Sequence, residues 1–122
     1  MTIRELIERL DREKMHNFPQ ADLMEYLNEV EADVAEQMHK TDVPVYVYDH
    51  DLDTELLAPA PYDRLYISYI KAMIDYANEE YASYQLNQEQ YDADMFQFIN
   101  WIVRTQEGRE NSNFPRRLKH TW

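Results

Sequence analysis

Residues 62–84 read YDRLYISYIKAMIDYANEEYASY, a strongly apolar and aromatic stretch near the middle of the chain. Its apolar side chains recur three and four positions apart, which is the spacing of one face of a helix. The face comprises Leu65, Tyr66, Tyr69, Met73, Tyr76, Ala77 and Tyr84, and Ile67, Ile70 and Ile74 widen it. So broad a face predicts a central helix, beginning at about Tyr62, that other elements contact from two sides.

Two amphipathic helices are expected before the central one. Thr2 and Glu5 have the spacing of a capping box at the start of the first helix. The apolar face of this helix is formed by Ile3, Leu6, Ile7 and Leu10. Pro19 is well placed at the start of the second helix, because the N–H that proline lacks is not needed there. The second helix carries Leu23, Tyr26, Leu27, Val30, Val34 and Met38 at helical spacing.

The sequence after residue 84 predicts a fourth helix followed by an arm. Residues 85–90 are polar, and they form either a short turn or a continuation of the central helix. The next amphipathic pattern consists of Tyr91, Met95, Phe98, Ile99 and Ile102. Gly108 is expected to end this helix. We therefore divide the chain into a helical domain, residues 1–108, and a basic extended C-terminal arm, residues 109–122.

One segment has the composition of a β-strand. Residues 43–48 read VPVYVY, which is rich in β-branched and aromatic side chains. Pro44 cannot donate a hydrogen bond to a neighbouring strand, so this segment is expected at an edge or alone, and a neighbouring subunit is one candidate partner. A loop, residues 49–61, follows. The expected fold is therefore mainly α: a small bundle of about four helices with one short extended strand and the C-terminal arm.

Charge is distributed unevenly along the chain. The formal net charge is −12, yet residues 104–122 contain five basic and two acidic residues and so carry +3. The remaining residues, 1–103, carry −15. An acidic body repels phosphate backbones, so no sequence-specific nucleic-acid partner is expected. No apolar run reaches the roughly 18 residues that a membrane-spanning helix needs, so no membrane partner is expected either.

Nothing in the sequence predicts catalysis, a cofactor or a firm metal site. The chain has no Cys and one Gly, which excludes Cys-ligated zinc, a thiolate nucleophile and Gly-rich phosphate loops. Asp49, Asp51 and Asp53 resemble the start of a calcium loop, but Thr54 and Ala60 stand where that loop needs Gly and Glu. Weak cation binding at these aspartates stays open. The histidines, at positions 16, 39, 50 and 120, lack ligand spacing.

Two features of the sequence predict contacts with other proteins. The chain has ten tyrosines, and those on the central helix serve either the core or an interface. In the arm, apolar residues alternate with basic ones, which favours docking on an acidic partner surface. The residues expected at a subunit or partner interface are Tyr46, Tyr48, Tyr66, Tyr69, Arg109, Phe114, Arg116, Arg117, Lys119 and Trp122.

Parts of the sequence resemble a family of phage proteins. The segments DTELL at residues 53–57, PAPYDRLY at 59–66 and AMIDYANEEY at 72–81 are similar to segments of small structural proteins of long-tailed bacteriophages. The opening residues 2–5 and residues 27–31 follow the same pattern, so the resemblance covers roughly residues 2–105. Such proteins are head–tail connector, or adaptor, proteins.

The resemblance implies a function in virion assembly. A connector subunit has a helical fold, is made in the host bacterial cytoplasm and ends in the phage neck as part of a ring. The implied partners are the portal protein, tail-side neck proteins and further copies of the chain, with DNA passing through the ring. The family has no catalytic residues. The alternative reading is a small acidic cytosolic regulatory binding protein, such as an inhibitor that mimics DNA.

Overall fold

The computed structural model describes residues 1–14 and 16–113, with side chains described as far as residue 105. The helices are α1 (Ile3–Glu13), α2 (Gln20–Gln37), the short α3 (Tyr48–Asp51), α4 (Arg64–Ala77) and α5 (Tyr81–Asn113). The predicted mainly α bundle is confirmed. The predicted strand is wrong, because in the described part of the chain only an isolated bridge between Thr2 and Glu55 has β pairing.

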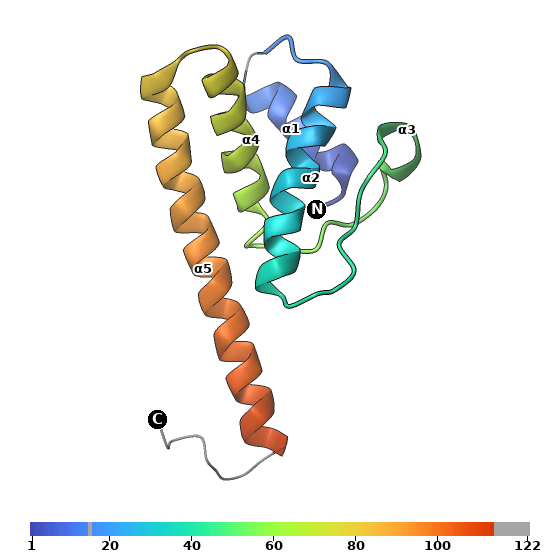
Figure 1. Ribbon diagram of the computed structural model, residues 1–122, viewed down its shortest axis with the longest axis vertical. Coiled ribbons are helices and arrows are strands. Elements are labelled where there is room, and N and C mark those ends of the chain that lie inside the picture. The colour runs from blue at the N-terminus through green and yellow to red at the C-terminus, as the bar shows by residue number, and fades with distance from the viewer. Residues whose placement is uncertain (15, 114–122) are drawn as a thin grey trace.

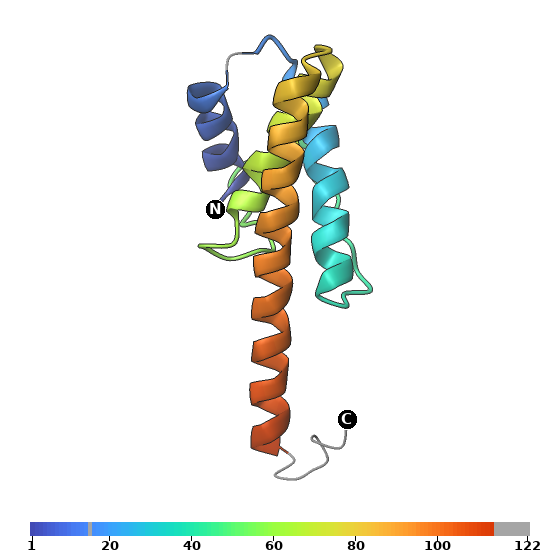
Figure 2. The same ribbon diagram turned by 90° about the vertical axis from the view of Figure 1, so that its left-hand side faces the viewer.

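The helices pack around α4, with α1 and α2 on one side and α5 on the other (Figures 1 and 2). α5 has 33 residues and is therefore about 50 Å long. It runs antiparallel to α4 and continues well past the end of the other helices in both views. The result is a small bundle from which one helix projects.

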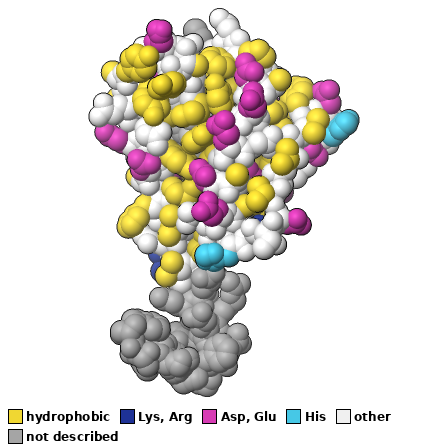
Figure 3. All heavy atoms as spheres, in the orientation of Figure 1, with side chains coloured by type: hydrophobic (Ala, Val, Ile, Leu, Met, Phe, Trp, Pro, Cys, Tyr) yellow, Lys and Arg dark blue, Asp and Glu magenta, His cyan; other side chains and the backbone are white. Residues whose placement is uncertain are grey.

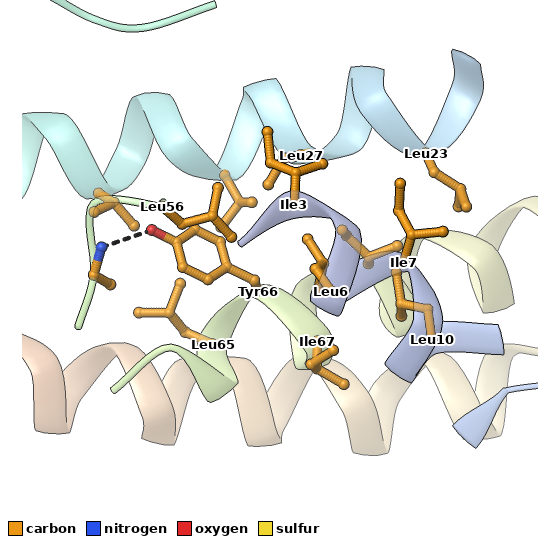
Figure 4. Packing of buried hydrophobic residues seen from close by; sticks show 14 of the residues in the cluster. Ile3, Leu6, Ile7, Leu10, Leu23, Leu27, Leu56, Leu65, Tyr66 and Ile67 are labelled. Atoms are coloured by element: carbon orange, nitrogen blue, oxygen red, sulfur yellow. Dashed lines mark hydrogen bonds between the residues drawn. The ribbon is translucent and has the colours of Figure 1, made fainter. Parts of the chain in front are cut away.

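α1 and α2 form as the sequence predicts. Thr2 Oγ1 accepts a hydrogen bond from the Glu5 amide at 3.2 Å, and a Glu5 carboxylate oxygen accepts one from the Thr2 amide at 2.8 Å. This confirms the capping box. Figure 4 shows how the apolar faces of α1 and α2 meet α4 in the core, where the fully buried side chains include Ile3, Leu6, Leu10, Leu27 and Leu65.

α4 is the central helix, as predicted, but it ends at Ala77 rather than at Tyr84. Glu79 adopts a left-handed conformation with φ of 60°. The Glu80 amide then donates to the Asp75 carbonyl at 2.9 Å, which closes the helix end in the manner usually served by glycine. The chain turns here, so the expected helix over residues 62–84 is divided between α4 and α5.

A tertiary contact explains why the turn precedes residue 85. Asp75 is fully buried, and its Oδ2 accepts hydrogen bonds from Ser83 at 2.6 Å and from Asn87 at 2.7 Å. Lys14 pairs with the other oxygen of Asp75. Burial raises the pKa of Asp75, but the hydrogen bonds from Lys14, Ser83 and Asn87 outweigh it and leave the pKa lowered. These bonds hold the start of α5 against the end of α4.

The end of α5 also differs from the prediction. Gly108 lies within α5, which continues to Asn113, so Gly108 does not end the helix. Glycine inside a helix destabilises it by only about 1 kcal/mol relative to alanine. The neighbouring Gln, Glu and Arg residues favour the helix and offset this cost. Residues 109–113, expected in an extended arm, are therefore helical. The rest of the arm lies outside the described residues.

Candidate subunit interface

The segment with β composition is extended but has no neighbouring strand in the described residues. Asn28 of α2 holds it in place: its side-chain oxygen accepts from the Tyr46 amide at 2.9 Å, and its side-chain nitrogen donates to the Tyr46 carbonyl at 3.2 Å. The outward side chains are Val43, Val45 and Val47, which are 46%, 73% and 53% exposed. We call residues 43–47 the valine segment.

Two tyrosines expected at the interface belong to the core instead. Tyr66 has no exposed surface and Tyr46 is 8% exposed. Both hydroxyls donate to the buried carboxylate of Glu31, at 2.5 Å from Tyr66 and 2.7 Å from Tyr46. Burial, together with this carboxylate, raises the pKa of both phenols. Their side chains anchor the fold and present no surface to a partner.

The Glu31 carboxylate also fixes the loop before α4. The Leu57 amide donates to Glu31 at 3.0 Å, and the Ala58 amide donates to the Tyr66 hydroxyl at 2.9 Å; the latter is the dashed line in Figure 4. A buried carboxylate needs such donors, because an unpaired charge in a core is costly. Hydrogen bonds to the Glu31 carboxylate thus connect α2 with the valine segment, the loop and α4.

The other expected interface residues have different positions. Tyr48 and Tyr69 are half-buried, and the Tyr69 hydroxyl donates to Glu29 at 2.9 Å. Burial and this bond raise the Tyr69 pKa. Arg109 lies within α5. The remaining residues of the prediction lie outside the described part: Phe114, Arg116, Arg117, Lys119 and Trp122.

α5 carries a second apolar face that the sequence reasoning missed. Its inner face packs on the bundle through Tyr91, Phe98 and Ile102. On the opposite side, residues follow one another at alternating spacings of three and four, the heptad pattern of helices that pair with other helices. These residues, which we call the outer seam, are Leu86, Glu89, Ala93, Phe96, Asn100 and Val103.

The outer seam is open to solvent. Leu86 is 69% exposed, Phe96 60% and Val103 45%. Four of its six positions are apolar, whereas an outward face on a lone bundle is usually polar. The signal was present in the sequence as a 3-4 spacing, but the stronger pattern of the inner face concealed it.

A further apolar surface lies at the turn between α4 and α5. Tyr76 contacts Tyr81 and Tyr84, with ring centroids 5.9 and 5.2 Å apart. Tyr76 and Tyr81 are each 57% exposed. Figure 3 shows apolar side chains gathered over this end of the molecule. Exposed tyrosines are therefore present at the α4–α5 turn, but Tyr66 and Tyr69, the interface residues predicted on the central helix, are not among them.

Acidic side chains form a row along α2, visible in Figure 3. The helix has no Lys or Arg, and its carboxylates apart from Glu31 recur three or four residues apart: Asp22, Glu25, Glu29, Asp33 and Glu36. The pKa of Asp33 is raised, chiefly by burial and further by Glu36 and Glu29, against the lowering effect of Tyr91. This face is suited to a basic partner.

The aspartates considered for cation binding do not converge. Asp51 accepts a hydrogen bond from the Val47 amide at 2.7 Å, and Asp53 pairs with Arg4 at 3.0 Å. Within the described residues, no group of three or more His, Asp or Glu side chains could hold a metal ion. Asp49 and Asp51 instead lie within the short helix α3, and Asp53 follows it in the chain.

Among the helices of the described chain, none combines the length and apolar character that crossing a membrane requires. Comparison of this chain with protein-family models, with curated proteins and with solved structures found no match.

Proposed function

We propose that this protein is a structural assembly subunit that joins the head of a long-tailed phage to its tail as one member of an oligomeric ring. The observation that carries the proposal is the outer seam of α5. A monomer whose core is already complete has no need of three large exposed apolar side chains at heptad spacing on its outermost helix. Contact with a helix of another subunit would bury them.

The position of the surfaces supports a ring rather than a symmetric dimer. The outer seam lies on one flank of the bundle, the acidic row lies on α2, and the basic C-terminal part follows the projecting end of α5. These surfaces differ in chemistry, so they favour a contact between unlike faces of two copies. Repeated contacts of this kind close into rings.

The charge of the body supports passage of DNA. Residues 1–103 carry −15, and an acidic lumen repels the phosphate backbone. DNA could then move through the ring without binding to it. The sequence resemblance to connector proteins, which is most specific in residues 53–84, agrees with this function and implies the portal and the tail-side neck proteins as partners.

The acidic row on α2 favours one alternative, a regulatory protein that mimics DNA and occupies a basic site on its target. Mixing the protein with candidate portal protein, and separately with DNA-binding proteins in the presence of competitor DNA, distinguishes the two. Salt-resistant retention on the portal supports the connector. Retention by a DNA-binding protein that duplex DNA displaces, without portal binding, supports the mimic.

A further inference from the structure

The valine segment has an unpaired backbone edge. In an extended chain the N–H and C=O of one residue point to one side, and those of the next residue point to the other. Tyr46 directs both groups to Asn28, so Val45 directs its groups away from α2. Within the described residues, the N–H and C=O of Val43 and Val45 have no hydrogen-bond partner.

The surroundings of this edge are apolar and acidic. Val43, Val45 and Val47 project to solvent on one side. Asp42 and Asp49 flank the segment, and neither carboxylate pairs with a cation of the described chain. From residue 42 to residue 55 the sequence has five acidic residues and no Lys or Arg. A partner strand would therefore need alternating apolar and basic side chains.

The end of this chain has that pattern. Residues 116–122 read RRLKHTW, and in an extended conformation Leu118 and Trp122 share one face while Arg117 and Lys119 share the other. Residues 109–122 carry four basic residues and one acidic residue, a charge of +3. The segment complements the valine segment in both charge and period.

α5 projects beyond the bundle at its C-terminal end. The last described buried residue of α5 is Ile102, and the helix continues to Asn113, about 16 Å farther along its axis. In both ribbon views it leaves the bundle at the end away from the α4–α5 turn (Figures 1 and 2). Residue 114 therefore follows a helix end that stands clear of its own bundle.

We propose that residues 116–122 of one copy add as a β-strand to the valine segment of the next copy, with Val43 and Val45 supplying the backbone hydrogen bonds. Main-chain bonds would provide affinity, and the alternating side chains would provide register. The inference rests on the self-association that the proposed function requires. It adds the contact that links neighbouring subunits.

The absence of Cys from the chain makes disulfide cross-linking a direct test. One full-length chain carries Val45→Cys, and a second, size-tagged chain carries a single Cys at one position from 116 to 121. The pairs are mixed at high concentration, and again in material retained on portal protein. We expect the mixed-chain disulfide yield to alternate, several-fold higher for Arg116→Cys, Leu118→Cys and His120→Cys than for Arg117→Cys, Lys119→Cys and Thr121→Cys.

Two controls make the result specific. Gln97→Cys, at an exposed position of α5 outside the outer seam, replaces Val45→Cys and should remove the alternation. A double variant, Val45→Cys with Leu118→Cys, reports cross-linking within one chain at high dilution. A yield without alternation, a preference for Val45–Val45 disulfides, or a dominant bond within one chain would each overturn the strand proposal.

The test also separates this proposal from the proposed function. An alternating yield without any portal binding would keep the strand contact and remove the connector assignment. Rings on the portal, with a disulfide yield that does not alternate, would support the connector assignment and rule out the strand contact.

Discussion

The side chain of Asn28 bonds to the backbone of Tyr46 through both its oxygen and its nitrogen, at 2.9 and 3.2 Å. One amide side chain thus does for a single residue what a neighbouring strand does for several. It explains how the five residues of the valine segment lie extended beside a helix without a sheet. It also fixes which backbone edge faces α2 and which faces outward.

Replacing Asn28 should loosen the valine segment. Asn28→Ala removes both bonds, and we expect the free energy of unfolding to fall by about 1–2 kcal/mol, with faster hydrogen exchange at the Tyr46 amide. Asn100→Ala is the matched control, because Asn100 is also half-buried within a helix and has no recorded side-chain bond among the described residues. Equal changes in urea unfolding for both variants would contradict the role of Asn28.

The buried carboxylate of Glu31 predicts unequal effects for two tyrosines. Tyr66→Phe deprives Glu31 of a donor and leaves the Ala58 amide without its acceptor, so we expect a loss of about 2–3 kcal/mol. Tyr62→Phe should cost less than about 0.5 kcal/mol, since its half-buried ring stacks on Trp101 and its hydroxyl forms no hydrogen bond within the described residues. Urea unfolding of both variants measures the difference, and similar losses would argue against the network.

Glu13 should account for part of the loss of folding stability at low pH. Hydrogen bonds from Arg9 at 2.6 Å and Lys71 at 2.9 Å lower its pKa to about 2. A lowered carboxyl pKa stabilises the fold at pH values above the ordinary range near 4.3, and this contribution disappears as the pH falls toward 2. The carboxylate is one-third exposed, so the contribution should stay below about 1 kcal/mol.

The comparison of wild type with Glu13→Gln isolates this contribution from the other carboxyls. We expect the variant to be less stable at neutral pH and to converge on wild type near pH 2. Glu8→Gln, an exposed change on the same helix, is the matched control for the loss of one carboxylate. A constant difference between wild type and Glu13→Gln across the whole range would contradict the assignment.

The turn between α4 and α5 predicts a stabilising substitution. Glu79 has φ of 60°, a conformation that costs a residue with a Cβ about 1 kcal/mol and costs glycine little. Glu79→Gly should therefore raise the free energy of unfolding by about 0.5–1 kcal/mol. Glu89→Gly, in the interior of α5, should lower it by a similar amount. Destabilisation by both changes would show that the turn is not strained.

Local patterns were sufficient to predict the helices that pack by one face. The capping box of Thr2, the apolar face of α2 and the central position of α4 all follow from short-range spacing. The break at Glu79 could not be predicted in this way, because it depends on Asp75 receiving bonds from Ser83 and Asn87 in the folded chain. The amino-acid composition around Glu79 does not indicate that its backbone adopts a left-handed conformation.

The candidate interface was only partly predictable for a related reason. Tyrosine content cannot distinguish Tyr66, which is buried against Glu31, from Tyr76, which is exposed at the turn. Similarly, the β composition of the valine segment was real, but Asn28 replaces the neighbouring strand. Which side of an amphipathic helix meets its own bundle is decided by tertiary packing, so the outer seam became evident only in the fold.

The outer seam predicts a charge substitution that separates assembly from folding. A double variant, Phe96→Glu with Val103→Glu, places charges where the apolar contact is proposed. Both side chains are exposed, so the free energy of unfolding should change by less than about 0.5 kcal/mol. Self-association or portal retention should weaken at least tenfold. Gln97→Glu, one residue from Phe96 but off the seam, should retain both. Unimpaired assembly of the double variant would exclude the seam as an interface.

Whether this chain forms a ring that joins head to tail can be decided by co-expressing it with the candidate portal protein and imaging the purified complex by negative-stain electron microscopy. We expect a ring of this protein stacked coaxially on the portal, with the same rotational symmetry in every particle. Bare portal rings, together with a monomeric chain in light scattering at the same concentration, would contradict it.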